Sequence, residues 1–321
     1  MSEGKIYTHC PDIFPGVRGT FQHLSAVAGT VHFNNPTEIF KIVKEKPDLV
    51  ILGGYLDYYT QVLFTCKKEG VKTAILFTST LGQAELSSDF IELAQLNALK
   101  KMLERNEITY LLFGSSSLSG VFASPKIKRY WNPFSVDYVQ KHLKQTENLP
   151  TQKVNGIVMF MPFAPRKNIV NQLMAVKILQ RDDPSLLLLT NNIAPQYRIF
   201  CNDFGIAFQD MGWLHPINYY RALQRAKASL QITLCEAFDY VAAESICSGT
   251  PVIVAPSVEW LYKDNTIGSV RHPDSIPEIY KALKETLTKP DQILEEQTKR
   301  LQEMCELHNS KAKELLKELT T

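Results

Sequence analysis

Short apolar runs alternate with amphipathic stretches along the N-terminal half of the chain. The runs at residues 47–53, 72–77 and 109–113 are bounded by turn-forming or charged residues, a pattern that predicts buried strands. Residues 59–69 and 94–105, which lie between these runs, have the length and the apolar spacing of helices. Strands that are apolar throughout are typical of parallel sheets covered on both faces. This half is therefore predicted to be an α/β domain.

A second series of the same kind follows the polar segment at residues 141–152, which we interpret as a linker. Its predicted strands are 156–161, 185–189, 228–234 and 252–255, and its predicted helices are 168–180, 216–225 and 241–247, with helix again from residue 277 to the end. The expected fold is α/β, with two doubly wound Rossmann-like domains at residues 1–140 and 150–290 that face each other across a cleft. The last helix, residues 295–321, is expected to cross back onto the first domain; a partner-binding or homodimer-forming helix is the alternative.

The composition describes a globular protein, since 45% of the 321 residues are apolar and 21% are charged. A net charge of only +2 gives no reason to expect a nucleic-acid partner. No apolar signal region or membrane span is recognised, and the six cysteines are scattered, as free thiols in a reducing compartment would be. We therefore expect a cytoplasmic protein. Residues 125–131, PKIKRYW, are the one candidate for contact with a membrane surface.

Two glutamates, Glu236 and Glu244, stand eight positions apart around the start of the predicted helix 241–247. The loop before that helix consists of Ala237, Phe238, Asp239 and Tyr240. Asp239 is a good N-cap, so that Glu236 precedes the helix and Glu244 lies in its first turns. A diphosphate could bind the free N–H groups of this helix start, with each carboxylate accepting hydrogen bonds from sugar hydroxyls on one side. A nucleotide-sugar has that layout, although a solvated acidic helix start would give the same spacing.

The stretch 228–255, ASLQITLCEAFDYVAAESICSGTPVIVA, resembles the C-terminal signature of the family-four retaining glycosyltransferases, which have the GT-B fold. The positions that match are Thr233, Glu236, Phe238, Glu244, Gly249, Thr250 and Pro251. Residues 209–226 and 130–137 resemble further family segments. The resemblance implies transfer of a hexose from a GDP- or UDP-sugar, with GDP-mannose as the first expectation, to a hydroxyl of a glycan, lipid or protein. It also implies that Glu236 contacts the transferred sugar and that Glu244 contacts the ribose.

Family members hold the donor diphosphate with an arginine and a lysine near the first strand of the second domain. Lys167 matches the lysine, whereas the place of the arginine falls at Met161 or Pro162. The neighbouring Arg166 is the candidate replacement. A solvated loop pair is the alternative interpretation of these two cations.

Other family features are altered in the N-terminal half. The family often carries a histidine after the strand that matches 72–77, where this chain has residues 78–80, Thr-Ser-Thr. His9 is the candidate replacement, and an ordinary surface or core histidine is the alternative. Residues 11–19, PDIFPGVRG, resemble a glycine-rich loop ahead of the first helix. Gly16 and Gly19 would let the backbone approach a phosphate and Arg18 would add charge, although an ordinary turn fits equally well.

The expected chemistry needs no metal and no cofactor. No Asp-x-Asp sequence occurs, so the charge of the leaving diphosphate is expected to fall on Lys167, Arg166 and the helix N-terminus. Trp213, Leu214 and His215 are candidates to line the pocket for the base, and core packing is the alternative. Two other functions remain open at this point: a nucleotide-sugar-binding protein without turnover, and a sugar-nucleotide epimerase on the same fold.

Overall fold

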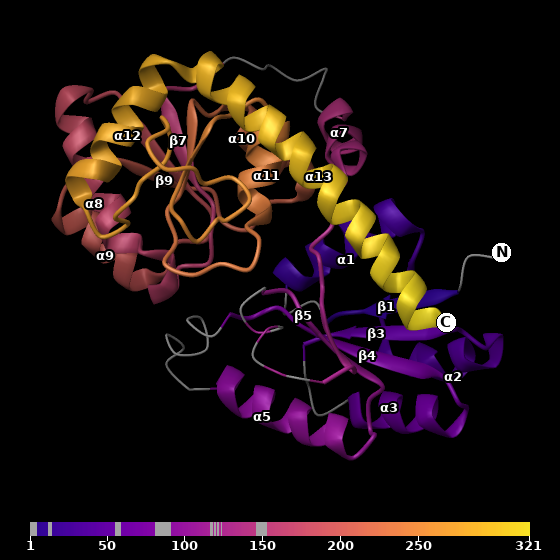
Figure 1. Cartoon of the computed structure of the whole chain (residues 1–321). Helices are drawn as coiled ribbons and strands as arrows, with labels where there is room; N and C mark the ends of the chain where they lie inside the picture. The colour runs from indigo at the N-terminus through magenta and orange to yellow at the C-terminus, as the bar shows by residue number, and fades with distance from the viewer. Residues whose placement is uncertain are drawn as a thin grey trace. The chain divides into compact units, whose positions relative to one another are not determined.

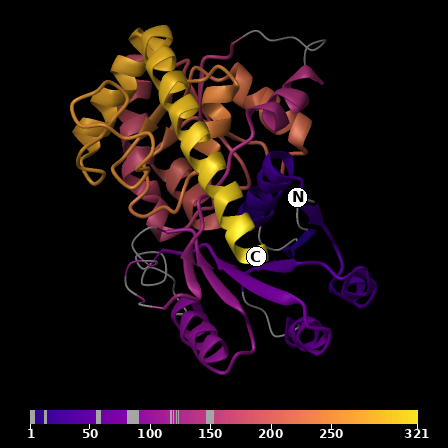
Figure 2. The same ribbon diagram turned by 45° about the vertical axis from the view of Figure 1, so that its right-hand side comes forward.

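The computed structural model describes residues 5–11, 15–54, 59–80, 91–115, 118, 120, 122, 124–145 and 153–321. The chain divides into two compact units, and each unit contains one sheet (Figures 1 and 2). The first unit comprises Met1–Ser135 together with Cys305–Thr321, and the second comprises Val136–Met304.

The sheet of the first unit is parallel throughout and has the strand order β2-β1-β3-β4-β5-β6. Its strands are β1 (Ile6–His9), β2 (Val31–His32), β3 (Leu49–Gly53), β4 (Lys72–Phe77), β5 (Tyr110–Phe113) and β6 (Ile127–Arg129). All five residues of β3 are buried, because helices cover both faces of this central strand. The predicted parallel α/β class is thereby confirmed for this half of the chain.

The two faces of this sheet are covered by different helices, as Figure 1 shows. The helices of the first unit are α1 (Pro15–Ala28), η1 (Pro36–Glu38), α2 (Ile39–Ile42), η2 (Val43–Glu45), α3 (Tyr59–Lys68) and α5 (Ile91–Glu104). One core joins α2, α3 and α5 to the sheet through Ile39, Val62 and Leu99. The opposite core joins Leu24 of α1 and Leu319 of α13 (Pro290–Thr320) to the sheet, so the end of the chain completes this face.

The second unit repeats the architecture with a five-stranded parallel sheet of order β11-β10-β7-β8-β9. Its strands are β7 (Gly156–Met159), β8 (Leu187–Thr190), β9 (Phe208–Asp210), β10 (Ala228–Gln231) and β11 (Val252–Val254). Its helices are α7 (Val136–Lys144), η3 (Pro165–Lys167), α8 (Ile169–Asp182), α9 (Pro195–Asp203), α10 (Pro216–Arg225), α11 (Tyr240–Cys247) and α12 (Ile276–Thr288), with the first part of α13. The start of the predicted linker is helical, because α7 continues to Lys144.

The strand order of the second unit places a topological switch point between β7 and β10. The chain proceeds from β7 to β8 and β9 in one direction, and then returns to the other side of β7 with β10 and β11. Loops that leave two such strands diverge to opposite faces of the sheet, which opens a crevice at their carboxyl ends. The loops after β7 and β10 contain Arg166, Lys167 and Glu236, so these residues are expected at that crevice.

The outer edge of β11 is covered by a side chain of α13. The amide of Gln297 donates to the carbonyl oxygen of Val252 (2.6 Å) and accepts from the N–H of the same residue (2.9 Å). An edge strand otherwise leaves its backbone groups unpaired. Gln297 is buried and takes the place of a further strand at Val252, whereas Val254 is paired by the backbone of Gly268 and Val270.

We predict that Gln297→Leu lowers the free energy of unfolding by about 2–4 kcal/mol, since it leaves a buried N–H and a buried C=O of Val252 unpaired. Urea unfolding at neutral pH measures the effect. Gln302→Leu makes the same chemical change at an exposed position of the same helix and should alter stability by less than about 0.5 kcal/mol. Equal effects of the two substitutions would show that the edge contact contributes nothing.

Candidate functional site

Two loops meet at the carboxyl edge of the second sheet, one after β7 and one after β10. The N–H of Leu234 donates to the carbonyl oxygen of Arg166 across 2.8 Å. The fully buried side chain of Gln172, on α8, donates to the carbonyl oxygens of Lys167 (2.6 Å) and Ile232 (3.0 Å) and accepts from the N–H of Ile232 (3.1 Å). Because one amide is bonded to both loops, their separation is fixed independently of their charges.

Arg166 and Lys167 converge on a single carboxylate, that of Glu236. Arg166 Nη1 lies 3.1 Å from Glu236 Oε2, and Lys167 Nζ is paired with the same oxygen. The three side chains are only 14%, 6% and 12% exposed, in the order Arg166, Lys167 and Glu236. Glu236 Oε1 also accepts from the backbone N–H of Ala237, 3.2 Å away. The interpretation of the two cations as a solvated loop pair is therefore wrong.

The ionisation of Glu236 is governed by this pairing. Burial by itself raises the pKa of the carboxyl group, but the charges of Lys167 and Arg166 outweigh burial and lower the pKa to about 2. Glu236 is thus an anion over the whole physiological range. A carboxylate held so strongly by two cations is a poor base and a poor nucleophile, and it acts as an electrostatic anchor.

The start of α11 lies beside this ion pair. Asp239 is the N-cap, as expected from the sequence: its Oδ1 accepts from the N–H of Ala242 across 3.0 Å. The residue adopts a left-handed conformation with φ of 67°, which aspartate tolerates better than most side chains. Trp260 stabilises the loop, because its Nε1 donates to the carbonyl oxygen of Phe238 (2.6 Å) and its ring stacks on that of Phe238.

Asp239 is 6% exposed, and its Oδ2 has no hydrogen-bond partner among the residues that the structure describes. Burial raises the pKa of this carboxyl group to about 6, with a further upward effect from Glu236 and an opposing attraction from Lys167. The folded-state pKa exceeds the ordinary value of 3.8. The protonated form therefore favours folding, and this contribution is lost as the pH rises through 6.

Glu244 lies within α11 and is held by two tyrosines of α10. The hydroxyl of Tyr219 donates to Glu244 Oε2 (2.6 Å), and that of Tyr220 donates to Oε1 (3.0 Å). Burial raises the pKa of both phenols, with the Glu244 carboxylate adding to the effect, so both remain donors at neutral pH. Sequence reasoning missed these tyrosines, because no motif spacing indicates which residues of α10 face α11.

The remaining predicted residues of the second unit include Tyr240, His215 and Trp213. Tyr240 begins α11, and its ring lies against that of Phe238. His215 is the N-cap residue of α10 and is exposed, with no hydrogen bond from its side chain to the helix start. Trp213 is 74% exposed, so core packing is the wrong interpretation of this residue.

The candidates of the first unit are placed differently from the prediction. Helix α1 begins at Pro15, so Gly16, Arg18 and Gly19 lie inside the helix and not in a loop ahead of it. Proline favours the first helical position, which explains the early start; residues 12–14 lie outside the described part of the chain. His9 is buried in β1, and its Nδ1 donates to the carbonyl oxygen of Phe33 at 2.7 Å. The interpretation of His9 as a core histidine is the one that agrees with the structure.

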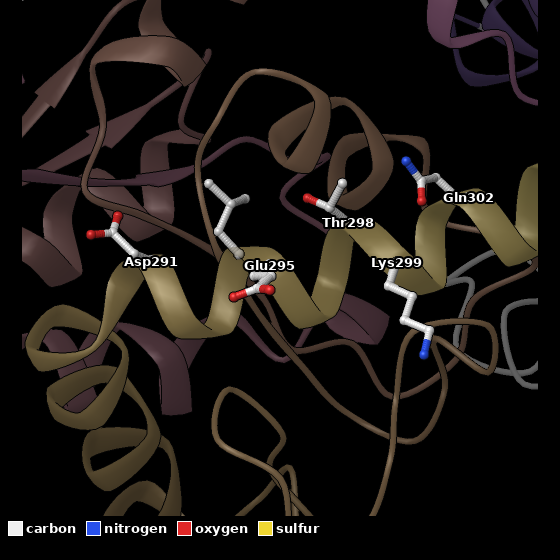
Figure 3. A pocket seen from close by; sticks show the side chains of 6 residues that line it. Asp291, Glu295, Thr298, Lys299 and Gln302 are labelled. Atoms are coloured by element: carbon white, nitrogen blue, oxygen red, sulfur yellow. The ribbon is translucent and has the colours of Figure 1, made fainter.

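No group of histidine, cysteine, aspartate and glutamate side chains suited to a metal ion occurs among the described residues. None of the described helices combines the length and the hydropathy that a membrane span requires. An open hollow of about 480 Å³ lies along α13 and is lined by Asp291, Leu294, Glu295, Thr298, Lys299 and Gln302 (Figure 3). It shares no residue with the cluster around Glu236.

We predict that Glu236→Gln lowers the free energy of unfolding at pH 7 by about 3 kcal/mol, since two buried cations lose their counter-charge. The folded-state pKa of Glu236 lies below the ordinary value of 4.5, so the stabilisation is present above pH 4.5 and is lost as the pH falls toward 2. Urea unfolding at pH 7 and pH 3 should therefore show a smaller difference between wild type and variant at the lower pH.

Glu303→Gln, at an exposed position of α13, provides the control and should change stability little at either pH. A difference between wild type and Glu236→Gln that is the same at pH 7 and pH 3 would contradict the ion pair.

No protein-family model and no curated protein sequence matches the chain significantly. The comparison with solved structures does find proteins of similar fold. A UDP-forming alpha,alpha-trehalose-phosphate synthase from Burkholderia xenovorans superimposes with a TM-score of 0.64 and 11% identity, over 99% of this chain and 98% of that one. Sucrose-phosphate synthase from Thermosynechococcus elongatus gives a TM-score of 0.64 and 13% identity, over 98% and 99%.

TarM from S. aureus, in a complex that contains UDP, gives a TM-score of 0.65 and 12% identity over 90% of this chain and 59% of that chain. Structural similarity at sequence identities of 11–13% establishes the fold alone. The chain therefore has the GT-B fold, as its sequence predicted.

Proposed function

We propose that this chain is a retaining glycosyltransferase that moves a hexose from a nucleoside-diphosphate sugar to an acceptor hydroxyl without a metal ion. The observation that carries the proposal is the convergence of Arg166 and Lys167 on Glu236 at the carboxyl ends of β7 and β10. Proteins of similar fold support it, since one is a UDP-forming synthase and the structure of another contains UDP. UDP-glucose and GDP-mannose are the donors to be tested first.

The two cations would neutralise the diphosphate as it leaves. Arg166 fills the role of the arginine that is missing at Met161 or Pro162, because its guanidinium reaches the same carboxylate as Lys167. Cations and helix N–H groups that are already in place stabilise developing negative charge without reorganisation. The N-terminus of α11, next to these cations, adds the positive end of its helix dipole.

The two glutamates would act at opposite ends of the donor. Glu244 is oriented by Tyr219 and Tyr220, and a carboxylate so fixed suits the paired hydroxyls of a ribose. Glu236 would accept hydrogen bonds from the transferred sugar through the oxygen that faces Ala237, while the other oxygen keeps its cations. Retention follows from the family resemblance, with the acceptor attacking on the face that the nucleotide leaves.

The acceptor is proposed to be a hydroxyl of a glycan, lipid or protein.

The six cysteines form no disulfide, which fits a reducing, cytoplasmic compartment. Burial raises the pKa of the Cys66 thiol to about 12 and that of Cys201 to about 11, so these two thiols are unreactive at neutral pH.

A second candidate function is nucleotide-sugar binding without turnover. The observation that favours it is the burial of His9, the candidate stand-in for the histidine of the family, in the core of the first unit. Incubation with donor and a panel of acceptors separates the two functions, because only a transferase releases the nucleoside diphosphate together with a glycosylated product. An epimerase on this fold would instead convert the donor in the absence of acceptor.

We predict that calorimetric titration with UDP- and GDP-sugars finds one donor with a dissociation constant of about 1–100 μM, and that Glu244→Ala weakens its binding at least roughly tenfold. The ribose hydroxyls would lose a charged acceptor. Glu303→Ala, on the exposed face of α13, is the matched control and should bind as wild type does. Unchanged binding by Glu244→Ala would remove Glu244 from the site.

Steady-state kinetics test the two cations. Arg166→Ala and Lys167→Ala should each lower kcat by roughly tenfold to a hundredfold, since one charged hydrogen bond to the leaving group is worth about 1.5–3 kcal/mol. Lys299→Ala, which removes an exposed cation from α13, should leave kcat unchanged. A wild-type kcat in both site variants would refute electrostatic assistance by this pair.

A further inference from the structure

The charges around the start of α11 balance one another. Arg166 and Lys167 supply two positive charges, while Glu236 and Asp239 supply two negative charges when both acids are ionised. All four side chains are largely buried, so solvent screens their interactions weakly. A fully ionised cluster therefore offers no surplus positive charge to a diphosphate, whose two phosphates bring at least two further negative charges.

Glu236 cannot relieve this conflict by taking up a proton. It is bonded to Arg166, to Lys167 and to the N–H of Ala237, and all of these interactions favour the anion. The acid that can take up a proton must have an oxygen that holds no hydrogen bond.

Asp239 meets that requirement. Its Oδ1 accepts from the N–H of Ala242 and caps the helix, whereas its buried Oδ2 has no partner among the described residues. A proton on Oδ2 would leave the cap intact and remove the negative charge of the side chain. The acid titrates close to neutrality even without a ligand, because burial raises its pKa to about 6.

Charged and titratable groups face Asp239 from three other elements in the described part of the chain. Lys167 and Arg166 lie on η3, Glu236 lies on the loop after β10, and Tyr219 lies on α10. The tyrosine remains a neutral phenol and Glu236 remains an anion at neutral pH. Of the two acids in this set, Asp239 is therefore the one whose charge changes near neutral pH.

We propose that binding of a nucleoside-diphosphate sugar at the start of α11 is coupled to the uptake of one proton by Asp239. The proton comes from solvent and binds to Oδ2. Uptake converts the balanced cluster into one with a net positive charge, which attracts the diphosphate. The inference rests on the proposed function, since it concerns the same donor site, and it predicts that donor binding weakens as the pH rises.

UDP-glucose and GDP-mannose are suitable probes, because both of their phosphates are esterified and neither phosphate titrates near neutral pH. Calorimetric titration at about pH 7.5, in buffers that differ in enthalpy of ionisation, should give an uptake of roughly 0.5–1 proton for each donor bound. The dissociation constant of the wild type should rise by roughly threefold to tenfold per pH unit between pH 6.5 and pH 8.

Asp239→Asn is the diagnostic variant. Asparagine retains an oxygen for the N-cap and tolerates the left-handed backbone, but it holds no titrating proton. It should bind the donor with a proton uptake near zero and with an affinity independent of pH in the same range. Asp182→Asn, at an exposed position at the end of α8, is the control and should keep the wild-type proton uptake.

The outcomes are distinct. Donor binding by the wild type without proton uptake overturns the coupling and leaves the proposed function standing. Uptake that persists in Asp239→Asn also overturns the coupling, because the proton then binds elsewhere. Absence of binding by both probes overturns the proposed function and this inference together. The wild-type measurement decides the question even if the variant is unstable.

Discussion

The candidate site depends on one buried carboxylate that holds two cations. Burying an ion pair costs solvation energy, and the cost is recovered only where the geometry is close and the remaining hydrogen bonds are made. Glu236 meets that condition through Arg166, Lys167 and the N–H of Ala237. Glu236 lies on the loop after β10, and its two cations lie on the loop after β7. The ion pair therefore joins the two loops that diverge at the switch point of the second sheet. Gln172 makes the same connection with neutral hydrogen bonds.

The same interaction defines what the site can do. Without a ligand the cations are already oriented, and the carboxylate stands in for the anion they are proposed to bind. A diphosphate would draw on charges that are fixed in place, which is how electrostatic preorganisation lowers the barrier for a leaving anion. A bound phosphate would have to compete with the acids at the start of α11 for the two cations. Protonation of Asp239 would reduce that competition.

Apolar runs made the central strands predictable, and also the short edge strand β11 (Val252–Val254), whereas an edge strand without such a run was not predicted. The run at 72–77 became β4 (Lys72–Phe77), but the three-residue β9 lacks a run and was missed. The family resemblance singled out Glu236, yet its pairing with Arg166 depends on how two loops fold together. The contacts of Glu244 with Tyr219 and Tyr220 depend on the packing of α10 against α11, which a single sequence does not specify.

A crystal structure of the chain with bound UDP-glucose would locate the diphosphate relative to the buried ion pair. We expect diphosphate oxygens within hydrogen-bonding distance of Arg166 and Lys167, next to the N-terminus of α11, with the ribose hydroxyls at Glu244. A nucleotide bound elsewhere, with both cations still paired to Glu236 alone, would contradict this expectation.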